Sequence, residues 1–171
     1  GVIDKNTPVK PKSAYGKSKF QAEELINKLA DDSFTVAILR PPMVYGKGCK
    51  GNYPRLAKLA LKTPIFPLVD NKRSMIYIDN LSEFVKQICD NTSSGLFLPQ
   101  NSEYVNTSEM VRLIAETHGK RIRIIKGFNL ILKLMVNNTL DKIFGDLVYD
   151  INVSNDVNLI SFPDTISRSE K

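Results

Sequence analysis

Two residues near the N-terminus, Tyr15 and Lys19, have side chains and a spacing that could carry out proton transfer. They stand in the stretch SAYGKSKFQAEELINKLA, residues 13–30, so in a helix they share one face with Cβ atoms about 5–6 Å apart. An ammonium that close to a phenol stabilises the phenolate, which makes a tyrosine usable as an acid or base near neutral pH. The same spacing also occurs in helices that merely expose polar residues, so the pair needs support from the rest of the sequence.

Helices and strands alternate along the chain that must position this pair. Helices are predicted over about 13–30, 53–62, 79–89, 106–118 and 128–145, and strands over 34–39, 74–78, 95–99 and 119–127. This alternation predicts an α/β fold, namely the C-terminal part of a Rossmann-like doubly wound parallel sheet with a smaller α/β substrate-binding region. We expect residues 1–92 to form the first part and residues 93–171 the second.

The first predicted helix has an apolar stripe that we expect to face the core. Its members recur at helical spacing: Ala22, Leu25, Ile26 and Leu29. Glu23, beside the stripe, is expected to face water. The next segment, 34–39, is almost wholly apolar, which is typical of a strand covered on both faces, and Pro41 and Pro42 end it.

Capping signals mark the starts of two later helices. Asn106 with Glu109 three positions on resembles a capping box, and either Asp79 or Asn80 is a suitable cap for the helix before it. The one histidine, His118, stands at the end of the helix that Asn106 opens. We expect His118 to complement the helix dipole there rather than to serve as a ligand or base.

The composition is that of an ordinary globular protein, with 42% hydrophobic and 25% charged residues in 171. No apolar run approaches the roughly 20 residues that span a bilayer, so we expect no membrane partner. Cys49 and Cys89 lack metal-ligand spacing and are typical of a reducing, cytoplasmic setting, although a disulfide between them stays open. The net charge of +6 favours a phosphate-bearing ligand, whereas the basic residues are spread along the chain without a nucleic-acid module. No nucleic-acid partner is therefore expected.

Three segments in order give the tyrosine–lysine pair its context. SAYGKSKFQAE (13–23) is followed by ILRPPMVYG (38–46) and by RSMIYIDNL (73–81). Together they resemble the extended short-chain dehydrogenase/reductase superfamily, in particular its NAD-dependent nucleotide-sugar epimerases and dehydratases, over about residues 8–165. GCKGNYPRL and FGDLVYD are also similar to a branch that handles UDP-N-acetylhexosamines as 4-epimerases or 4-keto reductases.

The resemblance implies roles for particular residues. Tyr15 would be the acid or base at the sugar hydroxyl, Lys19 would support it and hydrogen-bond the nicotinamide ribose, and Pro42 would pack near the nicotinamide. The implied contacts to the nucleotide-sugar are Asn52, Arg73, Lys142 and Asp146. NAD would be the cofactor, a UDP-sugar the substrate, and a homodimer would form through the helix that bears Tyr15; no metal is implied.

Parts of the family pattern are missing from this sequence. Met43 stands where many relatives have an asparagine, and Lys142 is the nearest cation to a position where an arginine is common. No G-x-x-G-x-x-G occurs in the chain, so the pyrophosphate cradle at a helix N-terminus is absent. We therefore expect an incomplete NAD site and a chain that is the C-terminal portion of the enzyme, inactive alone.

Two other functions stay open. The first is a non-catalytic binding or regulatory protein on the same scaffold, which would not require the side chains of Tyr15, Lys19 and Arg73. The second is a reductase of another small hydroxy or keto substrate, such as a steroid, which would not require Arg73 and Asn52 together. Asn52 could instead only satisfy the backbone of its turn, and Arg73 could be an exposed charge before a strand. The sugar, and the choice among epimerisation, dehydration and reduction, are left open by the sequence.

Overall fold

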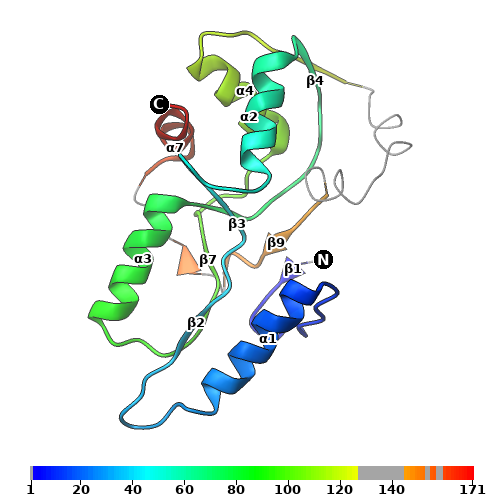
Figure 1. Ribbon diagram of the computed structural model, residues 1–171. Helices are drawn as coiled ribbons and strands as arrows, with labels where there is room; N and C mark the ends of the chain where they lie inside the picture. The colour runs from blue at the N-terminus through cyan, green and yellow to red at the C-terminus, as the bar shows by residue number, and fades with distance from the viewer. Residues whose placement is uncertain (1, 127–144, 153–154, 157–159) are drawn as a thin grey trace.

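The computed structural model describes residues 2–126, 145–152, 155–156 and 160–171, and within them short parallel strands alternate with helices (Figure 1). The elements in chain order are β1 (Val2–Ile3), α1 (Ala14–Asn27), β2 (Ala37–Leu39), β3 (Met43–Tyr45), α2 (Tyr53–Lys62), β4 (Ile65–Pro67), β5 (Met75–Tyr77), α3 (Ile78–Asp90), β6 (Gly95–Phe97), β7 (Pro99–Gln100), α4 (Thr107–Thr117), β8 (Arg123–Ile125), β9 (Val148–Tyr149), β10 (Asn155–Asp156) and α7 (Phe162–Ser169).

Every strand pair among these elements is parallel. β2 pairs with β6, β3 with β5, β4 with β8, β1 with β9 and β7 with β10. Parallel neighbours require a crossover between them, which here is supplied by helices and longer connections. The predicted α/β fold with parallel strands is therefore confirmed, while the division near residue 92 stays a prediction.

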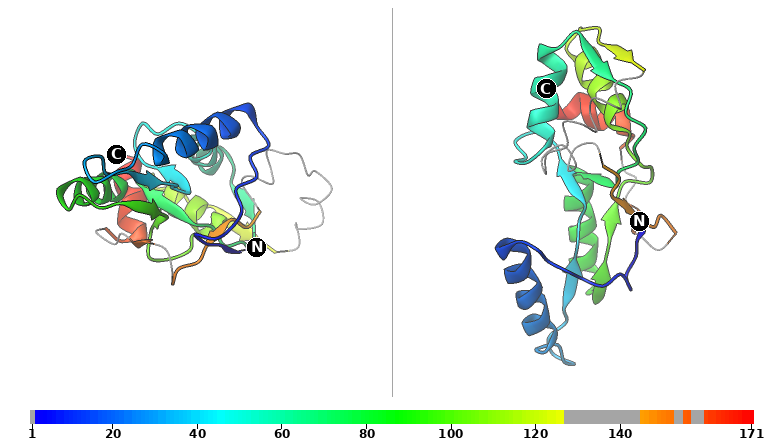
Figure 2. Two further views of the ribbon diagram at one scale, coloured as in Figure 1. Left: turned by 90° about the horizontal axis from the view of Figure 1, so that it is seen from below. Right: turned by 90° about the vertical axis from the view of Figure 1, so that its right-hand side faces the viewer.

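Strand β5 separates two hydrophobic clusters because its side chains alternate between opposite faces. Ile76 packs with Phe84 and Ile88 of α3 in the smaller cluster. Met75 and Tyr77 point to the other side, into a larger cluster that draws its buried side chains mainly from α2, α4 and α7. Figure 2 shows these three helices gathered at one end of the molecule, with α1 at the other.

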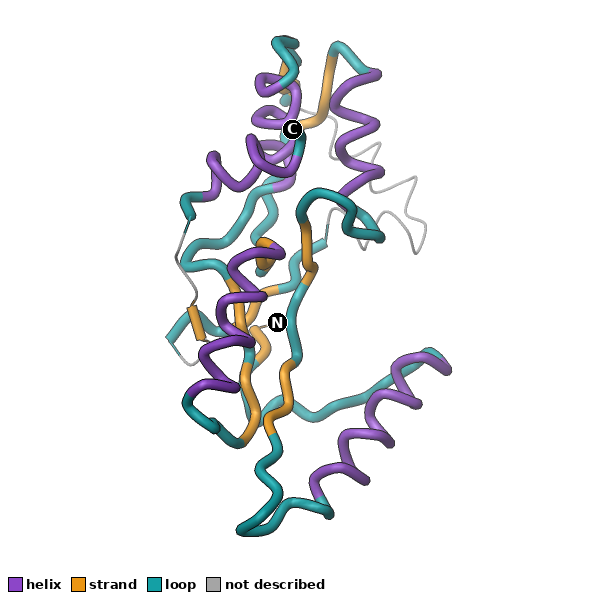
Figure 3. Tube along the Cα trace, turned by 60° about the vertical axis from the view of Figure 1, so that its left-hand side comes forward, coloured by secondary structure: helices purple, strands orange, loops and turns teal. Residues whose placement is uncertain are grey.

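The expected burial of α1 is wrong. No residue of α1 is buried, and the stripe that we assigned to the core is exposed: Leu25 is 61%, Ile26 41% and Leu29 62% exposed. Ala22 is exposed as well, whereas Glu23, expected to face water, is half-buried. The physical reason is that no described element packs on the apolar side of α1, which lies at the edge of the molecule in Figure 3.

Several other expectations change in detail. The strand predicted over 34–39 is shortened to β2, whose residues are half-buried rather than covered on both faces. Helix α3 begins after Tyr77 as N-cap, so neither Asp79 nor Asn80 caps it. The sequence did not predict β3, β4 or α7. The helix expected over 128–145 falls largely outside the described residues.

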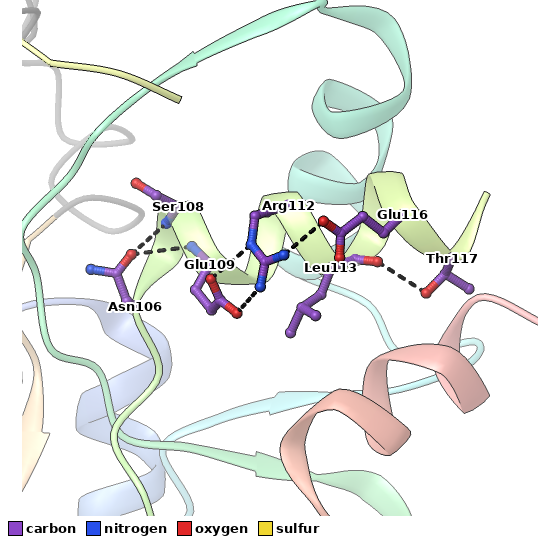
Figure 4. Close-up of polar contacts among 7 residues, drawn as sticks. All are labelled: Asn106, Ser108, Glu109, Arg112, Leu113, Glu116 and Thr117. Carbon is purple, nitrogen blue, oxygen red and sulfur yellow. Dashed lines mark hydrogen bonds and ion pairs between the residues drawn. The ribbon is translucent and has the colours of Figure 1, made fainter. Parts of the chain in front are cut away.

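Helix α4 starts where the sequence predicts, and Figure 4 shows how its first turns are held. The side chain of Asn106 accepts hydrogen bonds from the backbone N–H groups of Ser108 at 2.9 Å and Glu109 at 3.2 Å. Glu109 does not reach back to complete a capping box but pairs with Arg112, which also contacts Glu116 at 2.7 Å. The N-cap prediction is thus confirmed, whereas Glu109 forms an ion pair with Arg112 on the surface of α4 instead of a capping box.

The described part of the chain contains neither a disulfide nor a membrane-spanning helix. Cys49 and Cys89 are both free thiols, so the open possibility of a disulfide between them is not realised. No helix within the described ranges has the length and apolar character needed to cross a membrane.

Gly46, directly after β3, is required by a close approach. Its φ is +147°, and a Cβ there would lie 2.4 Å from Cγ2 of Ile78. We expect Gly46→Ala to lower the free energy of unfolding by about 2–3 kcal/mol, from strain plus overpacking. Gly48→Ala is the matched control, because Gly48 also has a positive φ, +76°, but nothing within 4 Å, and should cost only about 1 kcal/mol. Urea unfolding followed by circular dichroism compares the two; equal losses would contradict the close-packing argument.

Candidate functional site

The predicted proton-transfer pair lies together on the exposed face of α1. Ser13 caps the helix by accepting a hydrogen bond from the N–H of Gly16 at 3.0 Å. One turn separates Tyr15 from Lys19, whose Nζ lies 5.7 Å from the centroid of the Tyr15 ring, within the range of a cation–π contact. Tyr15 is 73% exposed, so its hydroxyl is open to a ligand from outside.

A carboxylate–guanidinium pair ties this helix to the strand beside it. Arg40, directly after β2, donates from Nε to Oε2 of Glu23 at 3.1 Å and from its terminal nitrogen to the other carboxylate oxygen. The two side chains are only 26% and 18% exposed, respectively. Because α1 buries no residue of its own, this fork is a principal link between the Tyr15-bearing helix and β2. No local pattern in the sequence predicts this ion pair, since Glu23 and Arg40 are 17 positions apart.

Pro42 stands just before β3, and β3 is anchored from its far end by Tyr45. Tyr45 is fully buried, accepts a hydrogen bond from Nδ2 of Asn101 at 3.0 Å and lies 2.7 Å from Oγ1 of Thr165. Because the Thr165 hydroxyl already donates to the carbonyl of Phe162, the Tyr45 hydroxyl is the donor to Thr165. Burial raises the pKa of Tyr45 to about 12. This network was not visible in the sequence, since its members are 120 positions apart.

Arg73 lies at a crossing of three chain segments. Its backbone N–H donates to Val105 at 3.0 Å and its carbonyl accepts from Val105 at 2.8 Å, while its guanidinium donates to the carbonyl of Gly145. Arg73 is only 6% exposed, so the alternative of an exposed surface charge is wrong. Burial lowers the pKa of Arg73, and the nearby Asp146 partly offsets this. Its Nε is buried and has no hydrogen-bond partner among the described residues.

The structure places Asp146 near Arg73. Oδ1 of Asp146 accepts from the N–H of Lys72 at 2.8 Å, next to the arginine. Asn52 is the half-buried N-cap of α2, and its side chain makes no capping hydrogen bond. The view that Asn52 serves only its turn therefore gains no support. Lys142 lies outside the described residues.

The C-terminal helix helps to place the start of α2. Tyr53, which follows Asn52, donates from its hydroxyl to Oε1 of Glu170 at 2.6 Å. The other oxygen of Glu170 lies 2.9 Å from Nε2 of His118, at the end of α4. His118 is thus at a helix end, as predicted, and is engaged by a carboxylate. No cluster of potential metal ligands occurs in the described part of the chain.

Two groups of candidate residues therefore result, Tyr15 with Lys19 on α1 and Arg73 with Asp146 at the crossing. No described contact joins one group to the other. Parallel strands joined by helices are typical of an α/β fold of the dinucleotide-binding type, and a tyrosine is one of the side chains that can act as a general acid or base. The chain belongs to the 3-beta hydroxysteroid dehydrogenase/isomerase family, whose model matches residues 3–93.

Curated relatives confirm the resemblance to nucleotide-sugar epimerases. The chain is 38% identical over 111 residues to a UDP-glucose 4-epimerase of Vibrio cholerae. The aligned region is 61% of this chain and 34% of that relative. It is 29% identical over 126 residues, 70% of the chain, to N-acetyl-alpha-D-glucosaminyl-diphospho-ditrans,octacis-undecaprenol 4-epimerase of Escherichia coli O157:H7, of which it covers 38%. The chain thus spans between one third and two fifths of the length of these relatives.

Solved structures confirm the fold. The UDP-glucuronic acid 4-epimerase from Bacillus cereus, solved in complex with NAD, aligns with 99% of this chain at a TM-score of 0.69 and 18% identity. The UDP-Glc/GlcNAc 4-epimerase from Campylobacter jejuni aligns over the same share at a TM-score of 0.68 and 18% identity. The chain covers 55% and 57% of these two structures, so the Rossmann-like expectation holds for the part that is shared.

The link between α1 and β2 can be tested by Glu23→Gln. The substitution removes the charge-assisted fork to Arg40, which we expect to be worth about 1–2 kcal/mol at this half-buried position. Amides of α1 should then exchange with solvent deuterium about tenfold faster, while those of α4 remain unchanged. Glu24→Gln is the control, because Glu24 is exposed and lies beside Glu23. Unchanged exchange in Glu23→Gln would show that other contacts hold α1.

The buried hydroxyl of Tyr45 predicts a stability change at high pH. Because its pKa rises from 10 to about 12 on folding, the folded chain holds this proton more tightly than the unfolded chain. The resulting stability is present below pH 10 and is lost as pH rises through about 12, at up to about 1.4 kcal/mol per pH unit. Tyr45→Phe should therefore show a shallower fall of unfolding free energy above pH 10 than the unchanged chain. Identical slopes in urea titrations would refute the assignment.

Proposed function

We propose that this chain carries the proton-transfer pair and the diphosphate-binding part of an NAD-dependent nucleotide-sugar 4-epimerase, dehydratase or 4-keto reductase. The observation that carries the proposal is the Tyr15–Lys19 contact on an open helix, which a half-buried ion pair ties to the strand before Pro42. The identities to 4-epimerases support the substrate class, a UDP-hexose or UDP-N-acetylhexosamine. The whole activity belongs to proteins about twice as long or longer, so it is proposed for this chain as part of such an enzyme.

Tyr15 is the acid or base in this proposal. Tyr15 is exposed, and the Lys19 ammonium lies 5.7 Å from the centroid of its ring, where it supports Tyr15 in this role. Tyr15 then takes a proton from a sugar hydroxyl, or returns one to a sugar carbonyl oxygen. Glu23 and Arg40 act through the helix, because they hold α1 in place rather than contact the sugar.

Arg73 and Asn52 bind the nucleotide-sugar in this proposal. The unpartnered Nε of Arg73 is a buried donor that a diphosphate oxygen can satisfy, and the guanidinium carries the positive charge that the diphosphate needs. Asn52 has an amide that its own helix does not use. Asp146 offers an exposed carboxylate near Arg73 for a hydroxyl of the nucleotide. Lys142 keeps its proposed role as a further cation toward the nucleotide.

NAD fits the part of its site that this chain contains. Lys19 has an exposed ammonium for the nicotinamide ribose, and Pro42 is half-buried on the connection between β2 and β3, after the end of a parallel strand. When bound, NAD would accept or return the hydride at the sugar carbon. No glycine-rich pyrophosphate cradle occurs among the 171 residues, so we expect the isolated chain to have negligible NAD affinity and no turnover.

The remaining expectations belong to the same proposal. The helix that bears Tyr15 is the proposed site of homodimer contact, through its exposed apolar stripe, and the cytoplasm is the proposed location. A non-catalytic binding protein and a reductase of another substrate are the competing functions. The family model carries a steroid name, so a 3-beta-hydroxysteroid is the competing ligand to test. The buried Arg73 favours the nucleotide-sugar, because a steroid offers no anion to pair with it.

Calorimetric titration with UDP tests the binding role of Arg73. We expect UDP to bind the chain and Arg73→Ala to weaken binding by about 10–100-fold, the loss typical of a charge-assisted hydrogen-bond pair. Arg73→Lys keeps the charge but not the two-pronged hydrogen bonding of a guanidinium, so its affinity for UDP should lie between those of the unchanged chain and Arg73→Ala. It also serves as the test if the alanine variant does not fold. Tyr15→Phe should bind UDP within about twofold, because the phenol acts at the sugar.

Arg121→Ala is the matched control for this titration, because Arg121 is an exposed arginine far along the chain from Arg73. UDP binding that is the same in both arginine variants would exclude Arg73 as the diphosphate ligand. A chain that binds a 3-beta-hydroxysteroid and not UDP would favour the competing reductase, and one that binds neither would favour the non-catalytic function.

A further inference from the structure

The positive charge of the chain is concentrated in two segments. Residues 47–69 and 117–126 together contain nine of the 24 basic residues and none of the 18 acidic ones. The rest of the chain is therefore net acidic, although the whole has a net charge of +6. Because the two segments are far apart in the sequence, the basic residues are spread along the chain, and only the fold can bring them together.

In the first segment the charges form a stripe on α2. Tyr53, Leu56 and Ala60 are the buried residues of this helix. Arg55, Lys58 and Lys62 follow the spacing i, i+3, i+7, so they lie within about 60° of arc on the side opposite the core. All three are exposed, and Leu59, which is 36% exposed, flanks them.

The fold joins the second segment to the C-terminal end of this stripe. Lys120 donates from Nζ to the carbonyl of Leu61 at 2.8 Å. Arg123 donates from its backbone to Pro64 at 3.0 Å and is the register partner of Ile65 in the β4–β8 pair. Arg123 is exposed, as is Ile65 at 46%. Figure 2 shows α2, β4 and β8 at the same end of the molecule.

We define the basic face by the exposed cations of α2 and of the segment that leads into β8. Its members are Arg55, Lys58, Lys62, Lys120, Arg121 and Arg123. Carboxylates of neighbouring elements are already engaged: Glu116 pairs with Arg112, and Glu170 binds Tyr53 and His118. No ion pair within the described parts of the chain involves a cation of the basic face.

We propose that the basic face docks on the surface of an anionic lipid bilayer. A helix that lies on such a surface needs cations for the headgroups and apolar side chains that reach between them. Arg55, Lys58 and Lys62 supply the first, and Leu59 and Ile65 supply exposed apolar groups beside them. The contact is peripheral and is separate from Tyr15 and Arg73, so it does not depend on the proposed enzymatic function.

Two features of the face favour a bilayer over nucleic acid. Single-stranded nucleic acid is bound by cations interleaved with exposed aromatic rings on which bases stack. Tyr53 and Phe66, the aromatic residues of α2 and β4, are both buried, and the exposed apolar groups are aliphatic. The proposal departs from the expectation that there is no membrane partner, because a surface contact does not need the length of a spanning segment.

Co-sedimentation with vesicles tests the proposal. Vesicles of phosphatidylcholine with about 30% phosphatidylglycerol should bind the chain at about 0.1 M salt, and pure phosphatidylcholine vesicles should not. The triple variant R55E/K58E/K62E should lose at least about tenfold in partition, because each cation near an anionic surface contributes measurably. Binding should also fall at about 1 M salt, where charges are screened within about 3 Å.

The control is K5E/K10E/K12E, which changes the net charge by the same amount at three exposed lysines outside the basic face. Circular dichroism spectra and melting curves of both triple variants should match the unchanged chain, and R55Q/K58Q/K62Q provides a milder variant if the reversal impairs folding. The proposal is overturned if the anionic vesicles do not bind, or if both triple variants lose binding equally, which would indicate net charge alone. Preferential binding of an RNA homopolymer over the vesicles would overturn it as well.

Discussion

The buried hydroxyl of Tyr45 links three segments of this fold that lie far apart in the sequence. It connects β3 to Asn101 after β7 and to Thr165 of α7, three segments whose backbones are otherwise held by separate strand pairs and helix contacts. A buried polar network of this kind stabilises a fold only when each member is satisfied, and here Thr165 donates onward to a backbone carbonyl. Once α7 is placed, Glu170 can reach Tyr53, and the start of α2 with Asn52 is placed in turn.

The end of the molecule that bears α1 depends on a different kind of interaction. The core beneath α2, α4 and α7 is apolar and closely packed, whereas α1 buries nothing and is linked to β2 by one carboxylate–guanidinium fork. Charge-assisted hydrogen bonds are directional, so a single fork can fix the orientation of a helix without burying area. The helix that carries the candidate acid or base is therefore positioned electrostatically, and the candidate anion ligand Arg73 is positioned by backbone pairing and burial.

The family match bears on both groups of candidate residues, Tyr15 with Lys19 and Arg73 with Asp146. The family model covers the part of the chain with Tyr15, Lys19, Pro42 and Arg73, and two curated relatives are 4-epimerases. The proposed proton transfer at Tyr15 and the proposed anion binding at Arg73 are distinct tasks, and the described structure keeps the two residues in separate segments. The basic face on α2 and β8 is a third feature, and its charge is independent of both.

Local patterns in the sequence determined much of the fold. Helices α2 and α4 and strand β5 were predictable because helical periodicity, an N-cap asparagine and an aromatic, β-branched run depend on neighbouring residues only. The Tyr15–Lys19 contact was predictable for the same reason, since four positions in a helix fix it. Tertiary structure alone decided what depends on distant residues: the exposure of the α1 stripe, the Glu23–Arg40 fork, the burial of Arg73, and the union of two basic segments into one face. Whether a side chain is buried, and which charges lie near it, depends on the elements that pack around it. A local sequence pattern does not determine which elements become neighbours.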